Sequence, residues 1–311
     1  MKSNKKKFSV FSFWLIAYCL QSTISFAQPM QVQNAYMYLK EKSFDKAKVS
    51  ADAAVLHEKT KDVPKAWLYR GQVYQAIFQD TSRKVNQLDA EAQEKAVESF
   101  VKCYQLDKDQ IYKSDLKAGL SVSAGSLLNK AENYLALKQY DKTSAACELL
   151  KSAVPFDSDE LLKRRNVTVE NIMYLQYRAY YLGNDAVKAK EIGNKLTGMN
   201  YKVPLIYSTM AKLFLADKDT TSALSYLDKG LALFDDNIDL LTMQIDILMM
   251  QKKTALLKEK LESAVEASPN SDIMHAALAN VYEKSNNREK AEEEYKKAML
   301  DIEKINIKTF K

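Results

Sequence analysis

Apolar and polar positions along the chain follow the period of amphipathic helices. Residues 272–305 show the pattern most clearly, because they form two amphipathic stretches joined by the polar turn 285–288. Segments 204–237 and 238–271 have the same length of 34 residues and align with it without gaps. The pattern therefore predicts a chain of helical hairpins that repeats every 34 residues.

The same period extends over most of the chain. Starts near residues 28, 64, 124 and 170 bring four more segments into register, so the predicted units are 28–63, 64–123, 124–169, 170–203, 204–237, 238–271 and 272–305. The eighth place of the units holds Ala35, Gly71, Ala131, Tyr177, Ala211, Ile245 and Ala279. The twentieth place holds Ala47, Ala96, Thr143, Ala189, Ala223, Leu257 and Ala291. The eleventh place holds Tyr38, Tyr74, Tyr134, Tyr180, Phe214, Leu248 and Tyr282, of which six are aromatic.

Small residues at places 8 and 20 and an aromatic residue at place 11 resemble the tetratricopeptide repeat. Small side chains let the two helices of a hairpin approach toward the short end of the usual range of about 8–10 Å. Because one hairpin cannot cover its own apolar face, hairpins of this kind stack on one another. The resemblance implies an all-α fold, a right-handed superhelix of about seven stacked antiparallel helix pairs, as a single domain over residues 28–311.

Three segments depart from the period. Ala96 follows Tyr74 by 22 positions where nine is usual, so we expect a longer inter-helix loop or extended helices near residues 79–92. About a dozen extra residues precede the third and fourth units, near 109–123 and 158–169, and we expect longer first helices to absorb them. These insertions are places, besides a groove, where a partner can bind.

Composition excludes other fold classes. With 7 Gly and 5 Pro, the chain has too few for a turn-rich all-β fold or a Pro/Gly-rich disordered chain, and its 47% of hydrophobic residues can bury a core. The prolines agree with the repeat register, because none falls inside a predicted helix, where proline would break the hydrogen bonding. They are Pro29, Pro64, Pro155, Pro204 and Pro269.

Residues 1–27 have the three-part layout of a secretory signal peptide. Four lysines without an acid precede an apolar run over residues 8–20, and a small-residue cleavage site ends at Ala27. The run is shorter than the roughly 20 residues of a membrane helix. Tyr18 stands before Cys19 where bacterial lipoprotein signals keep a small residue. We expect an exported, unlipidated protein without a transmembrane segment in the mature chain, in the periplasm of a Gram-negative bacterium or secreted.

Charge argues against nucleic acid as a partner. Removal of residues 1–27 leaves 42 basic and 40 acidic residues, so the net charge falls from +6 to +2. The longest basic run, Lys163-Arg164-Arg165, is expected to lie on a solvated helix face. Nucleic-acid binding needs a basic stripe, and the sequence contains none.

The sequence contains no recognisable catalytic or metal-binding motif. His57 and His275 are far apart, and His275 falls at a packing place of its repeat. No Cys/His cluster has metal-ligand spacing, and no Gly-rich phosphate loop or nucleophile elbow occurs. Cys103 and Cys147 fall at buried places and are expected to be free thiols, and the acidic run 292–294 is expected to be solvated. We therefore expect a non-enzymatic protein without metal or cofactor.

The first helices of tetratricopeptide repeats line a concave groove that holds peptides or other proteins. By this resemblance, the candidate groove residues are Tyr174, Arg178, Tyr181, Ser208, Lys212, Asp246 and Met249. The basic side chains suit a partner's carboxylates, and the tyrosines supply apolar contact with a polar tip. The Lys/Asn set with which some family members clamp a peptide C-terminus is missing from place 5 of the units.

Three functions stay open. An exported scaffold or adaptor that binds a partner protein or peptide in the groove is favoured. The alternative is glycan binding, because some outer-membrane sugar-capture proteins are built on related helical repeats. Those proteins usually carry a lipid anchor and stacking aromatics, whereas the anchor motif fails here and Trp67 falls at a packing place. An enzyme without a recognisable motif is the third possibility.

Overall fold

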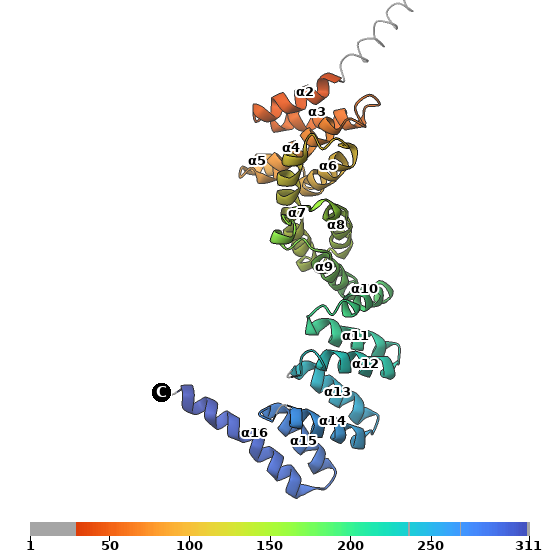
Figure 1. Cartoon of the computed structure of the whole chain (residues 1–311), viewed down its shortest axis with the longest axis vertical. Coiled ribbons are helices and arrows are strands. Elements are labelled where there is room, and N and C mark those ends of the chain that lie inside the picture. Colours follow the sequence, from red (N-terminus) through yellow and green to blue (C-terminus); the bar gives the residue numbers. More distant parts are fainter. Residues whose placement is uncertain (1–28, 236, 268, 310–311) are drawn as a thin grey trace, which may run out of the picture. The chain divides into compact units, whose positions relative to one another are not determined.

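The computed structural model describes residues 29–235, 237–267 and 269–309. These residues form fifteen α-helices, α2 to α16, with two 3₁₀ turns and no strand, which confirms the predicted all-α fold (Figure 1). None of the described helices is both long enough and apolar enough to cross a membrane. The predicted signal peptide, residues 1–27, lies outside the described part of the chain.

The chain divides into two compact units, Met1–Asn184 and Asp185–Lys311. The helices of the first unit are α2 (Pro29–Lys40), α3 (Phe44–Leu56), α4 (Pro64–Gln79), α5 (Arg83–Asn86), α6 (Ala92–Leu106), α7 (Lys113–Ala136), α8 (Tyr140–Ala153) and α9 (Val169–Leu182). The helices of the second unit are α10 (Ala186–Gly198), α11 (Pro204–Ala216), α12 (Thr220–Leu231), α13 (Ile238–Met250), α14 (Thr254–Ala267), α15 (Asp272–Lys284) and α16 (Arg288–Thr309). The pairs α2/α3, α4/α6 and α7/α8 of the first unit and α11/α12, α13/α14 and α15/α16 of the second fall in the predicted repeats, whereas α9 and α10 belong to different units.

Helices of successive repeats pack in two rows within the first unit. The first helices α2, α4, α7 and α9 contact one another in succession, and the second helices α6 and α8 do the same. One hydrophobic core runs through these layers and includes the fully buried Tyr74, Phe100 and Leu127. In the second unit α11 contacts both α12 and α13, and α15 packs on α14 and α16.

The residues at places 8 and 20 are buried, as the register predicts. Of the fourteen, only Ile245 is partly exposed. Helices α4 and α6 approach each other closely at Gly71, where a Cβ would lie 2.7 Å from the ring of Phe100. The repeat register inferred from the sequence is therefore confirmed by burial.

The three insertions take different forms. The segment after α4 is a loop that contains the short helix α5, and the second insertion is absorbed by the 24-residue α7, as expected. The expectation of a longer first helix near 158–169 is wrong. There the chain forms a 3₁₀ turn at Lys163–Arg165, and α9 begins only at Val169. Asp157 accepts a hydrogen bond from the backbone N–H of Leu162 (3.0 Å), which holds the chain in a turn.

This turn also corrects the expectation for the basic run. Lys163-Arg164-Arg165 lies in the 3₁₀ turn and not on an α-helix face, although all three side chains are exposed as expected. The following residue, Asn166, ends the turn in the left-handed conformation with φ of 61°. Asparagine tolerates this conformation better than most residues.

The turns that follow the first helices share one backbone conformation. A residue in the left-handed conformation follows six of the seven first helices, and none of the six is glycine. They are Lys42, Lys138, Asn184, Lys218, Lys252 and Asn286, with φ between 56° and 63°. Such a residue turns the chain out of the helix and satisfies terminal carbonyl groups.

Candidate functional site

The contacts between successive first helices create one face along each unit. In the first unit this face is built by α2, α4, α7 and α9, and in the second unit by α11 and α13. The candidate groove residues lie on α9, α11 and α13, so they belong to both units. Each group is considered within its own unit.

Three candidate residues lie together on α9. Arg178 forms an ion pair with Glu132 of α7 at 3.1 Å, and its guanidinium lies 5.7 Å from the centre of the Tyr174 ring. Tyr181 stacks on Tyr177 with ring centres 6.4 Å apart. Burial raises the pKa of Tyr174. Arg178 is therefore already engaged by a carboxylate of the chain, and a partner's acid would have to compete for it.

The candidates of the second unit differ in accessibility. Lys212 and Asp246 are exposed, and Met249 is half-buried with its sulfur 3.7 Å from the Lys284 ammonium. Ser208 is only 8% exposed, and its hydroxyl donates to the Leu205 carbonyl within α11 (3.2 Å). Ser208 thus offers little surface to a partner.

The structure shows a further group that sequence analysis missed. The rings of Tyr36 on α2 and Tyr69 on α4 stack with centres 4.9 Å apart and planes 26° from parallel. Lys40 lies 5.3 Å from the centre of the first ring and Lys65 lies 5.5 Å from the centre of the second. Three of the four residues occupy groove places 9, 13 and 2, so the same rule applied to the first two units would have found them. We call these four residues the tyrosine–lysine patch.

A network of charges around the buried Arg70 joins α3, α4 and α6. The Arg70 guanidinium donates to Asp52 (3.0 Å), Glu98 (2.9 Å) and Ser99 (2.8 Å), and the Tyr74 hydroxyl donates to Asp52 at 2.7 Å. Burial alone would raise the pKa of Asp52, but hydrogen bonds from Tyr74 and Arg70 hold it below its ordinary value. Both carboxylates accept from the one guanidinium, so Arg70 links the three helices.

His275 has the core role that its register place predicts. It is 4% exposed, with Nδ1 2.5 Å from Glu294 and Nε2 2.9 Å from the Pro269 carbonyl. Burial acts to raise the pKa of Glu294, but hydrogen bonds from Lys297 and His275 lower it below its ordinary value. Glu294 is therefore buried, which corrects the expectation that the whole acidic run 292–294 is solvated; the other two acids are exposed.

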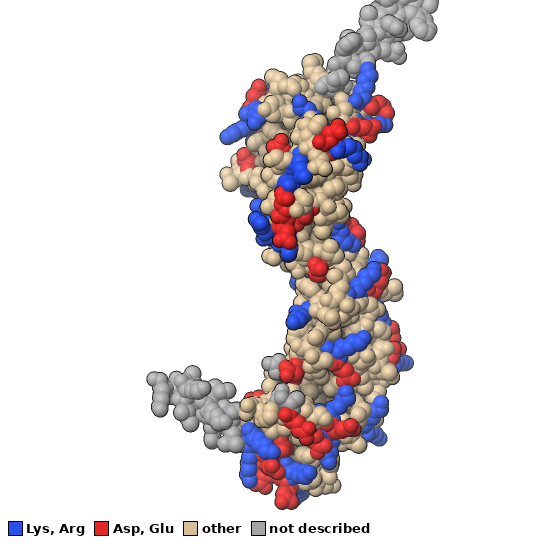
Figure 2. All heavy atoms as spheres, in the orientation of Figure 1, with Lys and Arg blue, Asp and Glu red and all other residues tan. Residues whose placement is uncertain are grey.

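Metal ligands, thiols and surface charges are the other candidate groups among the described residues. No three His, Cys, Asp or Glu side chains gather in the described ranges as metal ligands would. Cys103 and Cys147 are buried free thiols, as expected, and burial raises the pKa of each to about 12. On the face shown in Figure 2, basic and acidic side chains are interspersed.

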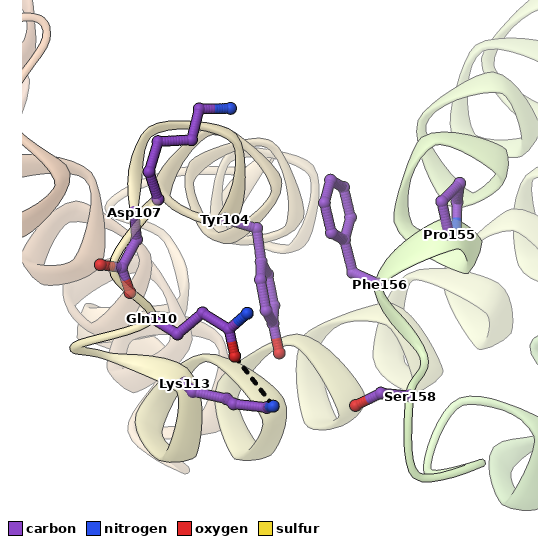
Figure 3. Close-up of a pocket in the computed structure, with 8 residues that line it drawn as sticks. Tyr104, Asp107, Gln110, Lys113, Pro155, Phe156 and Ser158 are labelled. Carbon is purple, nitrogen blue, oxygen red and sulfur yellow. Dashed lines mark hydrogen bonds between the residues drawn. The ribbon is translucent and has the colours of Figure 1, made fainter.

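A pocket of about 330 Å³ lies within the first unit, where the loop between α6 and α7 faces the turn after α8 (Figure 3). Gln110, Lys113 and Ser158 of its lining belong to the two insertions near 109–123 and 158–169. The pocket is lined by Tyr104, Asp107, Lys108, Gln110, Lys113, Pro155, Phe156 and Ser158. Its volume is at the lower end of the range of about 300–1,000 Å³ for ligand pockets.

Comparison with known proteins gives a partial family match. The profile of the ChAPs family, described as Chs5p-Arf1p-binding proteins, matches residues 144–294, which is just under half of the chain. A sequence search finds no curated protein that matches. The family match therefore marks a similarity over these residues.

Solved structures of similar helical proteins share little sequence with the chain. The structure described as "Crystal structure of YrrB: a TPR protein with an unusual peptide-binding site" is 16% identical, covers 66% of this chain and 92% of its own, and has a TM-score of 0.36. The Pseudomonas aeruginosa protein pilF is 18% identical, with coverages of 82% and 97% and a TM-score of 0.33. TM-scores this low do not establish a common fold over the whole chain. The chain is a tetratricopeptide-like helical repeat protein on the evidence of its own helix pairs and buried register.

Proposed function

We propose that this protein is a non-enzymatic scaffold that binds a partner protein or peptide on the first-helix face, and that it is exported to the cell envelope. The tyrosine–lysine patch carries the proposal. Tyr36 and Tyr69 are half-buried and are oriented by their mutual stacking. Lys40 and Lys65 form no ion pair with any described residue, so their charge is available to a partner.

The patch is suited to protein binding for two physical reasons. Tyrosine supplies apolar area together with a polar tip, and such residues dominate the energy of many interfaces. The two rings are already ordered by stacking, so binding pays little side-chain entropy at this point. A lysine without an acidic neighbour also gives up no ion pair when it meets a partner's carboxylate, in contrast to Arg178, which pairs with Glu132.

Each unit offers its own first-helix face, to which the candidate residues on α9 add in the first unit and those on α11 and α13 in the second. Tyr174 and Tyr181 contribute half-exposed rings, and Lys212 and Asp246 contribute exposed charges. The name of the ChAPs family describes proteins that bind other proteins, and its profile matches residues 144–294, which include these helices. This similarity supports a protein partner without identifying it.

The test is site-specific crosslinking in cells. A photo-reactive phenylalanine analogue replaces Tyr36 or Tyr69 in the tyrosine–lysine patch, and Val49 on the second helix α3, which is 69% exposed, serves as the control position. We expect the same one or few proteins from both patch positions and not from residue 49. Equal products from all three positions, or background alone from the patch, would reject this face as the binding surface.

Export is tested separately by the mass of the purified protein. Cleavage after Ala27 predicts a mature chain that begins at Gln28 and is recovered from the periplasm or medium. A full-length chain in the cytoplasm would reject export and would leave the crosslinking result unaffected.

A further inference from the structure

The pocket beside α6 and α8 has walls that are held in place by the chain itself. Asp107 ends α6, and its carboxylate accepts hydrogen bonds from the backbone N–H groups of Ile111 (3.0 Å) and Tyr112 (2.8 Å). On the opposite wall, Asp157 accepts from the backbone N–H of Leu162 (3.0 Å). Because these bonds order both loops, a ligand would not have to pay for folding them.

One side of the pocket is aromatic and ends in a polar atom. The rings of Tyr104 and Phe156 are stacked 4.9 Å apart and 15° from parallel, and Pro155 extends this apolar wall. The Tyr104 hydroxyl is buried and has no hydrogen-bond partner among the described residues. Figure 3 shows it pointing to the end of the pocket where the Lys113 amine and the Ser158 hydroxyl lie. A buried hydroxyl without a partner favours a ligand that brings an acceptor atom.

The charges that line the pocket are unbalanced. The Lys108 ammonium has no ion pair with any described residue, and the Lys113 ammonium donates only to the neutral Gln110 amide oxygen at 2.9 Å. Asp107 is the only acid in the lining, and it already accepts the two backbone N–H groups. The lining therefore holds two lysines and one acid, and the carboxylate of Asp159, just outside the lining, acts on Lys113 without forming an ion pair with it.

Neighbouring acids limit how much negative charge a ligand in the pocket can carry. Burial, together with the carboxylates of Asp159 and Asp157, raises the pKa of Tyr104 to about 12, so the phenol stays neutral near neutral pH and can donate a hydrogen bond. Asp159 is paired with Lys117, and Asp157 with backbone N–H groups. Their negative charge still opposes a second charge on a ligand.

We propose that this pocket binds a compact organic monoanion, a carboxylate attached to an apolar or aromatic group. The apolar part lies against Tyr104, Phe156 and Pro155, and the carboxylate accepts from Lys113, whose amine lies at the same end of the pocket as the Tyr104 hydroxyl (Figure 3). The volume of about 330 Å³ suits a group of the size of one amino-acid residue. The carboxylate can belong to a free small acid or to the last residue of a polypeptide.

The test is calorimetric titration of the full chain with three probes of similar shape. They are 3-phenylpropionate, its neutral analogue 3-phenylpropan-1-ol, and phenyl phosphate, which carries a second negative charge. We expect the propionate to bind about tenfold more tightly than the alcohol and at least as tightly as the phosphate. Changes in backbone amide NMR signals should be centred on Ile111, Tyr112 and Phe156.

Lysine variants connect the binding to the pocket. Lys113→Met should weaken 3-phenylpropionate binding about fivefold, because it removes the charge next to the carboxylate, whereas Lys108→Met should weaken it less. Lys84→Met in α5 is the matched control, because Lys84 is also exposed and has no ion pair with described residues but does not line the pocket. Far-ultraviolet circular dichroism confirms that all three variants are folded.

Clear outcomes would overturn the proposal. These are equal affinity for the acid and the alcohol, tighter binding of the phosphate, absence of binding at millimolar probe, or full affinity in Lys113→Met. A peptide that ends in phenylalanine separates the two sources. Binding equal to that of 3-phenylpropionate, lost on C-terminal amidation, assigns a polypeptide end, whereas binding more than tenfold weaker assigns a free acid.

Discussion

Gly230→Ala tests the close helix packing inferred for the second unit. A Cβ at residue 230 of α12 would lie 2.8 Å from the Cβ of Tyr207 on α11 and 2.9 Å from a methyl carbon of Leu240 on α13. The Cβ of Tyr207 is fixed to the α11 backbone, and Tyr207 and Leu240 are 1% and 0% exposed. The added methyl group can therefore be accommodated only if helices move apart.

Two opposing effects determine how much Gly230→Ala changes the free energy of unfolding. Alanine in place of glycine favours a helix interior by about 1 kcal/mol. Overpacking a close-packed core costs about 1–3 kcal/mol, and the 2.8 Å contact with the Cβ of Tyr207, which cannot move without its backbone, places Gly230 toward the upper end. We therefore expect Gly230→Ala to lower the free energy of unfolding by about 1–2 kcal/mol.

Gly198→Ala is the matched control within the same unit. Gly198 is the last residue of α10, and nothing lies within 4 Å of the place where its Cβ would be. Only the helix-propensity effect acts there, so this variant should be as stable as the wild type or more stable by up to about 1 kcal/mol. The same chemical change thus has opposite signs at two places.

Urea unfolding followed by circular dichroism measures the difference. A lower midpoint for Gly230→Ala with an unchanged slope reports lost stability, and hydrogen exchange should locate the loss in α11 and α12. The reasoning is refuted if Gly230→Ala matches or exceeds the stability of Gly198→Ala. In that case the two helices do not approach as closely as the structure indicates.

Three more predictions follow from buried groups. Ala223→Arg should lower the melting temperature strongly, because Ala223 is 0% exposed and the change both overpacks and buries a charge; wild-type melting would show that the register is wrong. Asp52→Asn should destabilise by about 2 kcal/mol near neutral pH by leaving buried Arg70 short of a partner. Because the pKa of Asp52 is lowered on folding, its contribution is present above the unfolded pKa of about 4 and is lost as pH falls below it, so urea midpoints of wild type and variant should converge in acid. Cys103 and Cys147 should resist iodoacetamide at pH 8 in the folded protein and react in urea, and rapid labelling of the folded chain would contradict their burial.

Much of the fold was predictable because paired helices need small and aromatic residues at a regular spacing in the sequence. The places of Ala47, Ala131 and Ala223 follow from a spacing of small and aromatic residues, and all three are fully buried. The insertion before α9 was not predictable in the same way. Nothing in its composition excludes a helix, and the turn depends on the carboxylate of Asp157 meeting a backbone N–H five residues later.

The candidate site was predictable only in part, for a related reason. The repeat register places Tyr174 and Tyr36 on first helices, but it does not predict which side chains they contact. The pairing of Arg178 with Glu132 joins residues 46 positions apart and removes a charge that the sequence suggested was available.

The amino-acid sequence by itself determined that this chain is a stack of helical hairpins, because an amphipathic hairpin must cover its apolar face and the next hairpin is the nearest cover. The tertiary structure alone decided which polar groups meet. The stack of Tyr36 on Tyr69 depends on how neighbouring repeats pack, and the pocket around Tyr104 and Phe156 depends on the paths of two loops. Loops follow no period, so their paths are set by individual hydrogen bonds such as those that Asp107 and Asp157 accept from the backbone.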